Sequence, residues 1–275
     1  MGYPPSRQAT LRAFLGLSST PAGELSPEKN RVAVAAVRRA LNSPPISYDR
    51  FLATDCWLAG GSVLRWLCGE ESEVHAAKRE FDFDFFFPSV EALDTTARTM
   101  LAQGFQLCGY RAFAQTIRAY LRGGLIAAAG SEICDESGKL APVTADLVKR
   151  LRLSYLELRS PQGDRVQLVA FFEPTPFATI CRFDLSICQL VMDAEYLQFG
   201  PWTCRDLMSK RLRVVDLRWP VSTFRRVLRY ALRGYRPNPT ALFKVSYSLL
   251  GYLLQRLPPY LLRLCVQPFV QRREP

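Results

Sequence analysis

Two aspartates within a run of phenylalanines have the residue type and spacing that most directly indicate chemistry. Residues 81–87 read Phe-Asp-Phe-Asp-Phe-Phe-Phe. Side chains alternate between the faces of a strand, so Asp82 and Asp84 share one face while Phe81, Phe83, Phe85 and Phe87 share the other. The Cα atoms of the two acids would lie about 7 Å apart. Their carboxylates can then converge on two Mg²⁺ ions spaced roughly 3.5–4 Å apart.

Burial of such an acid pair requires compensation. Asp is a poor strand former, and two carboxylates at the centre of an apolar ladder repel each other unless cations neutralise them. The pattern therefore predicts a divalent metal site at Asp82 and Asp84. The alternative is that both acids are solvated on an outer face of the sheet.

A glycine turn upstream offers a place for phosphate. Residues 57–59 are typical of a short buried strand, Gly60, Gly61 and Ser62 of a tight turn, and Val63–Leu67 of the start of a helix. The free N–H groups and partial positive charge of a helix N-terminus favour phosphate, and glycines allow the backbone to approach it closely. Most Gly-Gly pairs are only turns, so the acids on the next strand are what make this turn informative.

Several other chemistries lack the residues they need. The sequence has no GxxxxGK(S/T) motif, which excludes a Walker-type phosphate loop, and no GxGxxG follows a strand. His75 is the only histidine and lies in the charged stretch 69–80. Hydrolases of the Ser-His-Asp type and zinc sites with several histidines are therefore disfavoured.

Over roughly residues 55–190, these motifs resemble the nucleotidyltransferase superfamily, which includes DNA polymerase beta, poly(A) polymerases and CCA-adding enzymes. The resemblance implies transfer of a nucleoside monophosphate from an NTP to a hydroxyl. It also implies that Gly60, Gly61 and Ser62 bind the phosphates and that Asp82 and Asp84 bind two Mg²⁺ ions, or Mn²⁺. The stretch 69–80 makes the spacing between turn and acids longer than in compact members.

A third acid on a later strand completes the site in that family, and Asp184 is its best match here. Apolar residues flank it in the segment 180–188, which predicts a strand. The resemblance then implies that Asp184 binds the metal near the acceptor hydroxyl and acts as a base. The alternative is a structural acid at a strand edge, paired with Arg182.

Positive charge is concentrated in the last quarter of the chain. Residues 205–275 contain fifteen Lys and Arg against three acids, whereas the preceding part is close to neutral. A basic module of this kind is expected to meet polyanions. The alternative is that the arginines only solvate the helices that carry them.

An arginine-rich helix is predicted within this basic region, at residues 223–234. It resembles the helix of CCA-adding enzymes that touches the nucleotide, which implies nucleotide contacts for Arg225, Arg226, Arg229 and Tyr230. The alternative is an ordinary amphipathic helix that packs inward through Phe224, Val227, Leu228 and Ala231.

The chain as a whole is predicted to be an α/β (α+β) protein. We expect an N-terminal arm over 1–25, a catalytic domain over 26–204 and a basic helical region over 205–275. The catalytic domain should contain a mixed twisted sheet of about five strands with helices behind it. Its first helix should begin at Ser26 and present Val32, Val34, Val37 and Leu41 on one face. Residues 241–270 should form two helices, broken at Pro258–Pro259.

Composition indicates the surroundings of the protein. Eight cysteines without a CxxC pair predict reduced thiols in the cytoplasm. The sequence shows no secretory signal and no spanning helix, and a membrane-surface role is the less favoured reading of the apolar C-terminal segment.

Three functions agree with this sequence. The first is a nucleotidyltransferase whose acceptor is RNA or tRNA, favoured by the basic last quarter. The second has a small molecule or a protein hydroxyl as acceptor, as in cyclic-oligonucleotide synthases and toxin-like relatives. The third is a non-catalytic nucleic-acid-binding protein of the same fold, which the intact acid pair disfavours.

Overall fold

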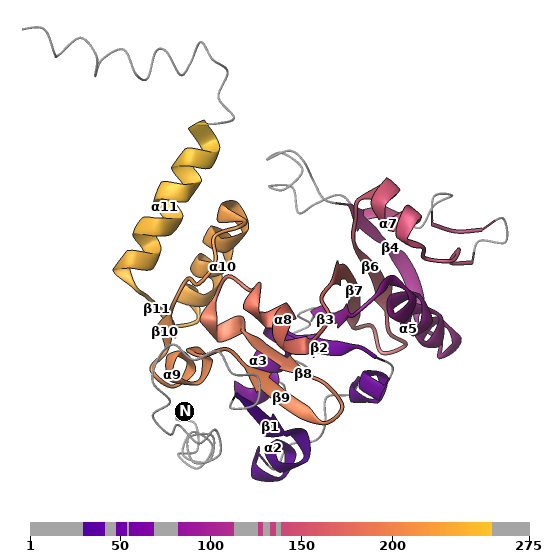
Figure 1. Ribbon diagram of the computed structural model, residues 1–275, viewed down its shortest axis with the longest axis horizontal. Helices are drawn as coiled ribbons and strands as arrows, with labels where there is room; N and C mark the ends of the chain where they lie inside the picture. Colours follow the sequence, from indigo (N-terminus) through magenta and orange to yellow (C-terminus); the bar gives the residue numbers. More distant parts are fainter. Residues whose placement is uncertain are drawn as a thin grey trace, which may run out of the picture. The chain divides into compact units, whose positions relative to one another are not determined.

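The computed structural model describes residues 30–41, 48–53, 55–68, 82–112, 126–128, 133–135 and 139–254. It contains two compact units (Figure 1). The first comprises Met1–Phe183 and Ile187–Arg205, and the second Asp184–Ser186 and Asp206–Pro275. The predicted N-terminal arm, the stretch 69–80 with His75, and the break at Pro258–Pro259 lie outside the described residues.

The first unit is built on one mixed sheet, so the predicted fold class is confirmed. Within the described residues the sheet has nine strands, in the order β1-β9-β8-β2-β3-β7-β6-β4-β5. Only β3 and β7 pair in parallel; the other neighbours are antiparallel. The strands are β1 (Arg31–Ala33), β2 (Trp57–Ala59), β3 (Asp82–Phe87), β4 (Gln106–Ala112), β5 (Ile126–Ala128), β6 (Leu153–Arg159), β7 (Arg165–Phe172), β8 (Leu190–Met192) and β9 (Tyr196–Phe199). The expectation of about five strands was too low, because short strands extend both edges of the sheet.

Helices connect these strands and cover the sheet. They are α2 (Val34–Leu41), η1 (Asp49–Ala53), α3 (Gly61–Cys68), α5 (Val90–Ala102), α7 (Ala145–Leu151), α8 (Pro176–Cys181), η2 (Ser186–Cys188) and α9 (Thr203–Met208). Ser89, Thr144 and Thr175 begin α5, α7 and α8, and each side chain accepts a hydrogen bond from a backbone N–H of the first turn. These caps satisfy amides that have no partner within the helix and so fix where the helices start.

Strand β3 lies near the middle of the sheet, between β2 and β7. On one face, Phe85 and Phe87 are fully buried. Phe83 is only partly buried and packs edge-on against Tyr48, at 4.5 Å between ring centroids. The Tyr48 hydroxyl donates to Asp164 in the turn before β7, and burial together with this carboxylate raises the pKa of Tyr48. The predicted phenylalanine ladder is therefore buried at its C-terminal end and open toward Phe83.

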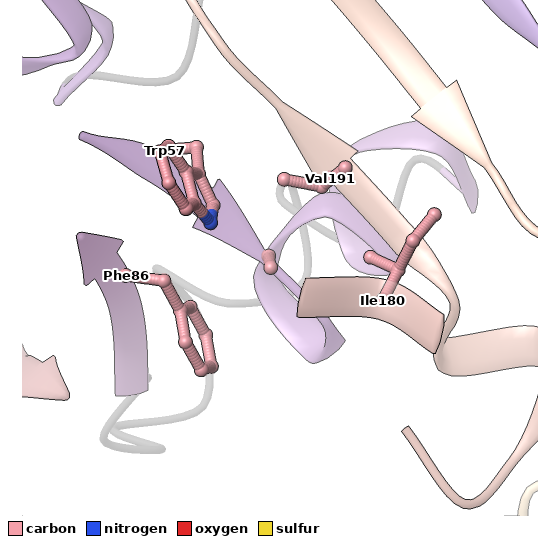
Figure 2. Packing of buried hydrophobic residues seen from close by; sticks show 5 residues of the cluster. Trp57, Phe86, Ile180 and Val191 are labelled. Atoms are coloured by element: carbon pink, nitrogen blue, oxygen red, sulfur yellow. The ribbon is translucent and has the colours of Figure 1, made fainter. Parts of the chain in front are cut away.

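The opposite face of β3 carries the two acids and then an apolar cluster. Phe86 packs there with Trp57 and Ala59 of β2, Val191 of β8 and Ile180 of α8 (Figure 2). The Trp57 indole N–H donates to the Thr179 hydroxyl at 2.9 Å, which ties β2 to α8. One face of a single strand thus passes from carboxylates at its start to a close-packed core at its end.

Ser26, where the first helix was predicted to begin, lies outside the described residues. Residues 31–33 form strand β1, which pairs with β9, and the helix α2 starts at Val34. Val32 therefore belongs to an edge strand, because pairing with β9 satisfies its backbone better than an isolated helical turn would. The buried stripe of Val34, Val37 and Leu41 is confirmed.

The second unit is mainly helical. It contains α10 (Pro220–Leu232), α11 (Pro239–Leu254) and the short parallel strands β10 (Arg211–Leu212) and β11 (Arg236–Pro237). Helix α10 confirms the arginine-rich helix, but its buried side chains are Thr223, Val227 and Tyr230. The expectation that Leu228 packs inward is wrong, since it is 48% exposed. Because Thr223 faces inward, the buried face of α10 runs through Thr223, Val227 and Tyr230 and leaves Leu228 outside it.

Length and hydropathy of the helices bear on membrane insertion. No helix in the described ranges combines the length and apolar character needed to cross a bilayer.

The turn between β2 and α3 yields a stability prediction. Gly60 has a φ of +76°, and a Cβ added there would lie 3.3 Å from the Phe183 ring. We expect Gly60→Ala to lower the free energy of unfolding by about 2 kcal/mol, through left-handed strain plus this contact. Urea denaturation measures the change.

Gly163→Ala is the matched control. Gly163 has a φ of +95°, and an added Cβ there would meet nothing within 4 Å. Its substitution should show the backbone strain alone, about 1 kcal/mol. Equal losses for both variants would contradict close packing of Phe183 over the turn.

Candidate active site

The two acids of β3 face charged and polar residues on the neighbouring strand. In the register of the sheet, Asp82 lies opposite Arg165 and Asp84 opposite Gln167, both on β7. Opposite residues on paired strands share a face, so these four side chains line the same surface. The Asp82 side chain is 43% exposed. The predicted placement of both acids on one face of a strand is thus confirmed, and the face is accessible to solvent.

Arg165 links Asp82 to a buried acid on the next strand. Its Nε and Nη2 donate to the Glu157 carboxylate of β6 at 3.1 and 2.8 Å. Its Nη1 lies 3.4 Å from Asp82 Oδ1. The Glu157 side chain is only 7% exposed, so the pair is shielded from water. Charge therefore continues across three strands, from β3 through β7 to β6.

Sequence reasoning missed Arg165, Gln167 and Glu157. A signal for Glu157 was present, because an acid within the apolar stretch 153–158 needs a buried partner. The identity of that partner depends on which strands are neighbours. A parallel pairing between β3 and β7 cannot be read from a local pattern.

The glycine turn is where the sequence placed it. Gly60 follows β2 directly, and Gly61 and Ser62 open α3. The register of β2 with β3 brings Leu58 opposite Phe85, and continuing it brings Ala59 level with Asp84. The start of α3 thus lies beside the acids.

Side chains of α3 fix the position of this turn. Arg65 donates to the Gly61 carbonyl at 3.0 Å and to the Asp82 carbonyl at 3.4 Å. Ser62 is buried, and its hydroxyl donates to the Ala59 carbonyl at 3.4 Å. In this arrangement Ser62 braces the turn, and the backbone amides are the groups that a phosphate would meet.

Asp184 does not lie on a strand. It occupies a bend after α8 and belongs to the second unit, whereas Asp82 and Asp84 belong to the first. Its carboxylate accepts from the Thr223 hydroxyl at 2.6 Å and from Arg226 Nε at 2.9 Å. The apolar residues on both sides of Asp184 predicted a strand. They are buried, but they belong to a bend and to the 3-10 turn η2.

The alternative partner for Asp184 was also wrong. Arg182 pairs with Glu173 at 2.7 Å, while Asp184 forms its ion pair with Arg226, also at 2.7 Å. Both Thr223 and Arg226 lie in the first two turns of α10. Asp184 therefore anchors the arginine-rich helix in the second unit.

The four nucleotide-binding candidates on α10 divide into two pairs. Arg225 and Arg229 are exposed, as their four-residue spacing predicts. Arg226 is engaged by Asp184, and Tyr230 is only 5% exposed. The Tyr230 ring packs edge-on against Tyr235, 5.8 Å between centroids. Arg225 and Arg229 are the members of this set that present their side chains to solvent.

The acid pair fits a magnesium ion by the chemistry of its donors. Mg²⁺ is commonly held by one or two carboxylates, with substrate phosphates and water completing its shell. Asp82 and Asp84 supply the two carboxylates, and Arg165 and Gln167 are their direct neighbours on β7. Among the residues that the structure describes, no three His, Cys, Asp or Glu side chains gather closely enough to hold a metal alone.

Comparison with protein families gives one match. The model of the Gabija anti-defense 2 family protein matches residues 41–210 of this chain. A search among curated proteins finds no matching sequence.

Solved CCA-adding enzymes are similar in structure. The Thermotoga maritima enzyme complexed with tRNA is 14% identical, with a TM-score of 0.48 over 83% of this chain and 48% of its own. A CCA-adding enzyme with CTP is 15% identical, with a TM-score of 0.48 over 90% of this chain and 51% of its own. An apo form is 13% identical, with a TM-score of 0.49 over 82% and 49%.

This chain spans about half the length of these structures. At these identities the likeness concerns the fold alone.

The contacts of Asp184 generate a prediction. Asp184→Asn removes the charge that pairs with Arg226, and we expect the free energy of unfolding to fall by about 1–2 kcal/mol. If Asp184 also serves catalysis, kcat should fall while KM for NTP stays unchanged. Denaturation and steady-state kinetics measure the two effects separately.

Asp216→Asn is the control for this variant. Asp216 pairs with Arg218 at 3.7 Å on the surface of the same unit, so its loss should change stability little. An Asp184→Asn variant as stable as wild type would contradict the anchoring role. A raised KM with intact kcat would remove Asp184 from the catalytic step.

Proposed function

The chain belongs to the Gabija anti-defense 2 family, and we propose that it is a magnesium-dependent nucleotidyltransferase that moves a nucleoside monophosphate from an NTP onto a hydroxyl. One observation carries the proposal. Asp82 and Asp84 share an accessible face of a central strand, level with a glycine turn that opens a helix. A carboxylate pair and the N-terminus of a helix therefore lie beside each other at one end of two central strands, which supports the proposal.

Each group of the site has a role in this proposal. Asp82 and Asp84 hold the metal. We expect two ions, either Mg²⁺ or Mn²⁺. The amides of Gly61 and Ser62 bind the outer phosphates. Within the second unit, Arg225 and Arg229 on the exposed side of α10 are proposed to contact nucleotide phosphates, while Arg226 and Tyr230 hold that helix in place. Asp184 was predicted as the third ligand and base, but its carboxylate is bound by Thr223 and Arg226 within the second unit, so its substitution tests whether it serves transfer as well.

Phosphoryl transfer explains why these groups are needed. The attacking hydroxyl, the α-phosphorus and the leaving pyrophosphate must be aligned while negative charge builds on the phosphates. When bound, the metal supplies positive charge at the phosphates and favours ionisation of the acceptor. The protein contributes position: strand β3 and helix α3 are tied together by the bond from Arg65 to the Asp82 carbonyl.

We propose RNA or tRNA as the acceptor. The second unit is strongly basic, and Arg211, Arg225, Arg229, Arg233 and Arg236 are all exposed in it. Arginines exposed on several elements are better suited to the many phosphates of a polynucleotide than to those of a single triphosphate.

The family match supports a second candidate acceptor. The anti-defense description of the family favours a target within the Gabija defense, such as a protein hydroxyl. Incubation with each α-labelled NTP, Mg²⁺ and either RNA or Gabija components distinguishes the acceptors, because labelled RNA and labelled protein migrate differently. No labelled product under any condition would favour a non-catalytic binding protein.

The acid pair gives the test of the activity itself. Asp82→Asn and Asp84→Asn should each lower the transfer rate by at least about 10³-fold. The amide carries no negative charge to neutralise Mg²⁺, and it is a weak ligand for this ion. Both variants should stay folded, since both acids lie on the accessible face. Asp146→Asn, which changes an exposed acid in the first turn of α7, is the control with unchanged rate. An active double variant would refute the assignment.

Exposed arginines of the second unit test the nucleic-acid acceptor. Arg211 and Arg236 lie opposite each other on β10 and β11, and both are exposed. Their double substitution by Ala should weaken RNA binding and flatten its dependence on log salt by about 1.4, two single-strand contacts at about 0.7 each. Affinity for free NTP should not change. A fluorescence titration across a salt series measures both.

Arg213 is unsuitable for this test. Its Nε donates to the fully buried Asp206 at 3.0 Å, so its removal would destabilise the unit. An unchanged salt slope in the Arg211 and Arg236 variant would shift the proposal to a protein or small-molecule acceptor.

A further inference from the structure

We propose that Arg165 is a positioning residue that fixes the carboxylate of Asp82 and, by its charge, lowers the affinity of the acid pair for a free divalent cation. The inference rests on the proposed nucleotidyltransferase function and adds a condition to it. Metal would bind firmly only together with the nucleotide, whose phosphates outweigh the charge of Arg165.

The first step is that Arg165 itself is held rigidly. Two of its nitrogens donate to the two oxygens of Glu157, at 3.1 and 2.8 Å. This side-on, two-point geometry fixes the plane of the guanidinium as well as its place. The Glu157 side chain is 7% exposed and that of Arg165 is 23% exposed. Swinging Arg165 away would leave a buried carboxylate without compensation, which is strongly unfavourable.

The second step is that the remaining terminal nitrogen points at the proposed metal ligand. Arg165 Nη1 lies 3.4 Å from Asp82 Oδ1, and the two residues are direct neighbours across the parallel strands. Glu157 lies opposite Gln167, so it is the diagonal neighbour of Arg165 on the same face. The sheet register therefore brings the three charged side chains together on one face, with Arg165 between Asp82 and Glu157.

The third step concerns the electrostatic effect on metal. A fixed cation next to Asp82 attracts the carboxylate and repels any divalent ion that the same carboxylate binds. For charges several Å apart at an effective dielectric constant near 20, this repulsion weakens ion binding by about tenfold or more. A nucleotide triphosphate reverses the balance, because its negative charge is attracted to both cations.

A purely structural role for Arg165 makes a different prediction. If the arginine only stabilised the sheet, its loss would disorder Asp82, and both metal affinity and turnover would fall together. If it positions Asp82 and opposes the metal, its loss should raise metal affinity while turnover falls. The sign of the change in metal affinity separates the two roles.

The test uses a double variant that leaves no buried charge behind. Glu157→Gln with Arg165→Met removes both charges with similar side-chain volumes, so the full chain is expected to fold. Mn²⁺ binding without nucleotide is measured by electron paramagnetic resonance, and kcat and KM for NTP by steady-state kinetics. We expect about tenfold tighter Mn²⁺ binding, at least about tenfold lower kcat and an unchanged KM.

Arg165→Lys provides a second variant should the first fail to fold. It keeps the positive charge but loses the two-point contact with Glu157. Its Mn²⁺ affinity should stay within about threefold of wild type, while kcat falls at least about fivefold. Retained kcat in this variant would overturn the positioning role.

Two controls assign each outcome. Arg98→Met removes an arginine paired with Asp94 on the surface of α5 and should change neither Mn²⁺ affinity nor kcat. Asp84→Asn should abolish Mn²⁺ binding, so that the signal of free Mn²⁺ is no longer reduced by the protein. This identifies the site being measured. Unchanged or weaker Mn²⁺ binding in the double variant would overturn the inference while the proposed function stands. Wild-type protein without any Asp84-dependent Mn²⁺ binding, with or without NTP, would overturn the proposed function itself.

Discussion

Charged groups on a sheet face that also carries an apolar core must be neutralised, and this constraint organises the first unit. The same face of β3 holds Asp82 and Asp84 at its start and the buried Phe86 at its end. Neutralisation comes from β7, where Arg165 bridges Asp82 and the buried Glu157. Loss of any one group would leave another charge poorly compensated. Asp82 is consequently held in place by its neighbour on β7.

The same physical rule applies separately within the second unit. Asp184 is bound by Thr223 and Arg226 of α10, and the buried Asp206 is bound by Ser186 and Arg213. Both acids are structural anchors for an otherwise basic, helical unit, and they fix which arginines remain exposed. The net charge of this region is thus a poor guide to the number of arginines that can meet a ligand. Arg226 and Arg213 act internally, whereas Arg225, Arg229, Arg211 and Arg236 face solvent.

Family membership and fold point in complementary directions. The Gabija anti-defense 2 match covers residues 41–210 and therefore includes β2, the turn, α3, β3 and β7. Those elements carry the acid pair and the helix terminus beside it.

The sequence by itself determined the local parts of the site. Alternation predicted the shared face of Asp82 and Asp84, glycines predicted the turn at Gly60, and spacing predicted that Arg225 and Arg229 share one face of a helix. All three follow from the periodicity of strands and helices or from the steric freedom of glycine, which act over a few residues. Only the tertiary structure decided which partners these residues meet. The pairing of β3 with β7, and of β7 with β6, brings Arg165 and Glu157 close to Asp82, although more than seventy residues of chain separate them. The bend after α8 allows Asp184 to pair with Arg226. Such contacts depend on strand order and burial, which no local pattern encodes.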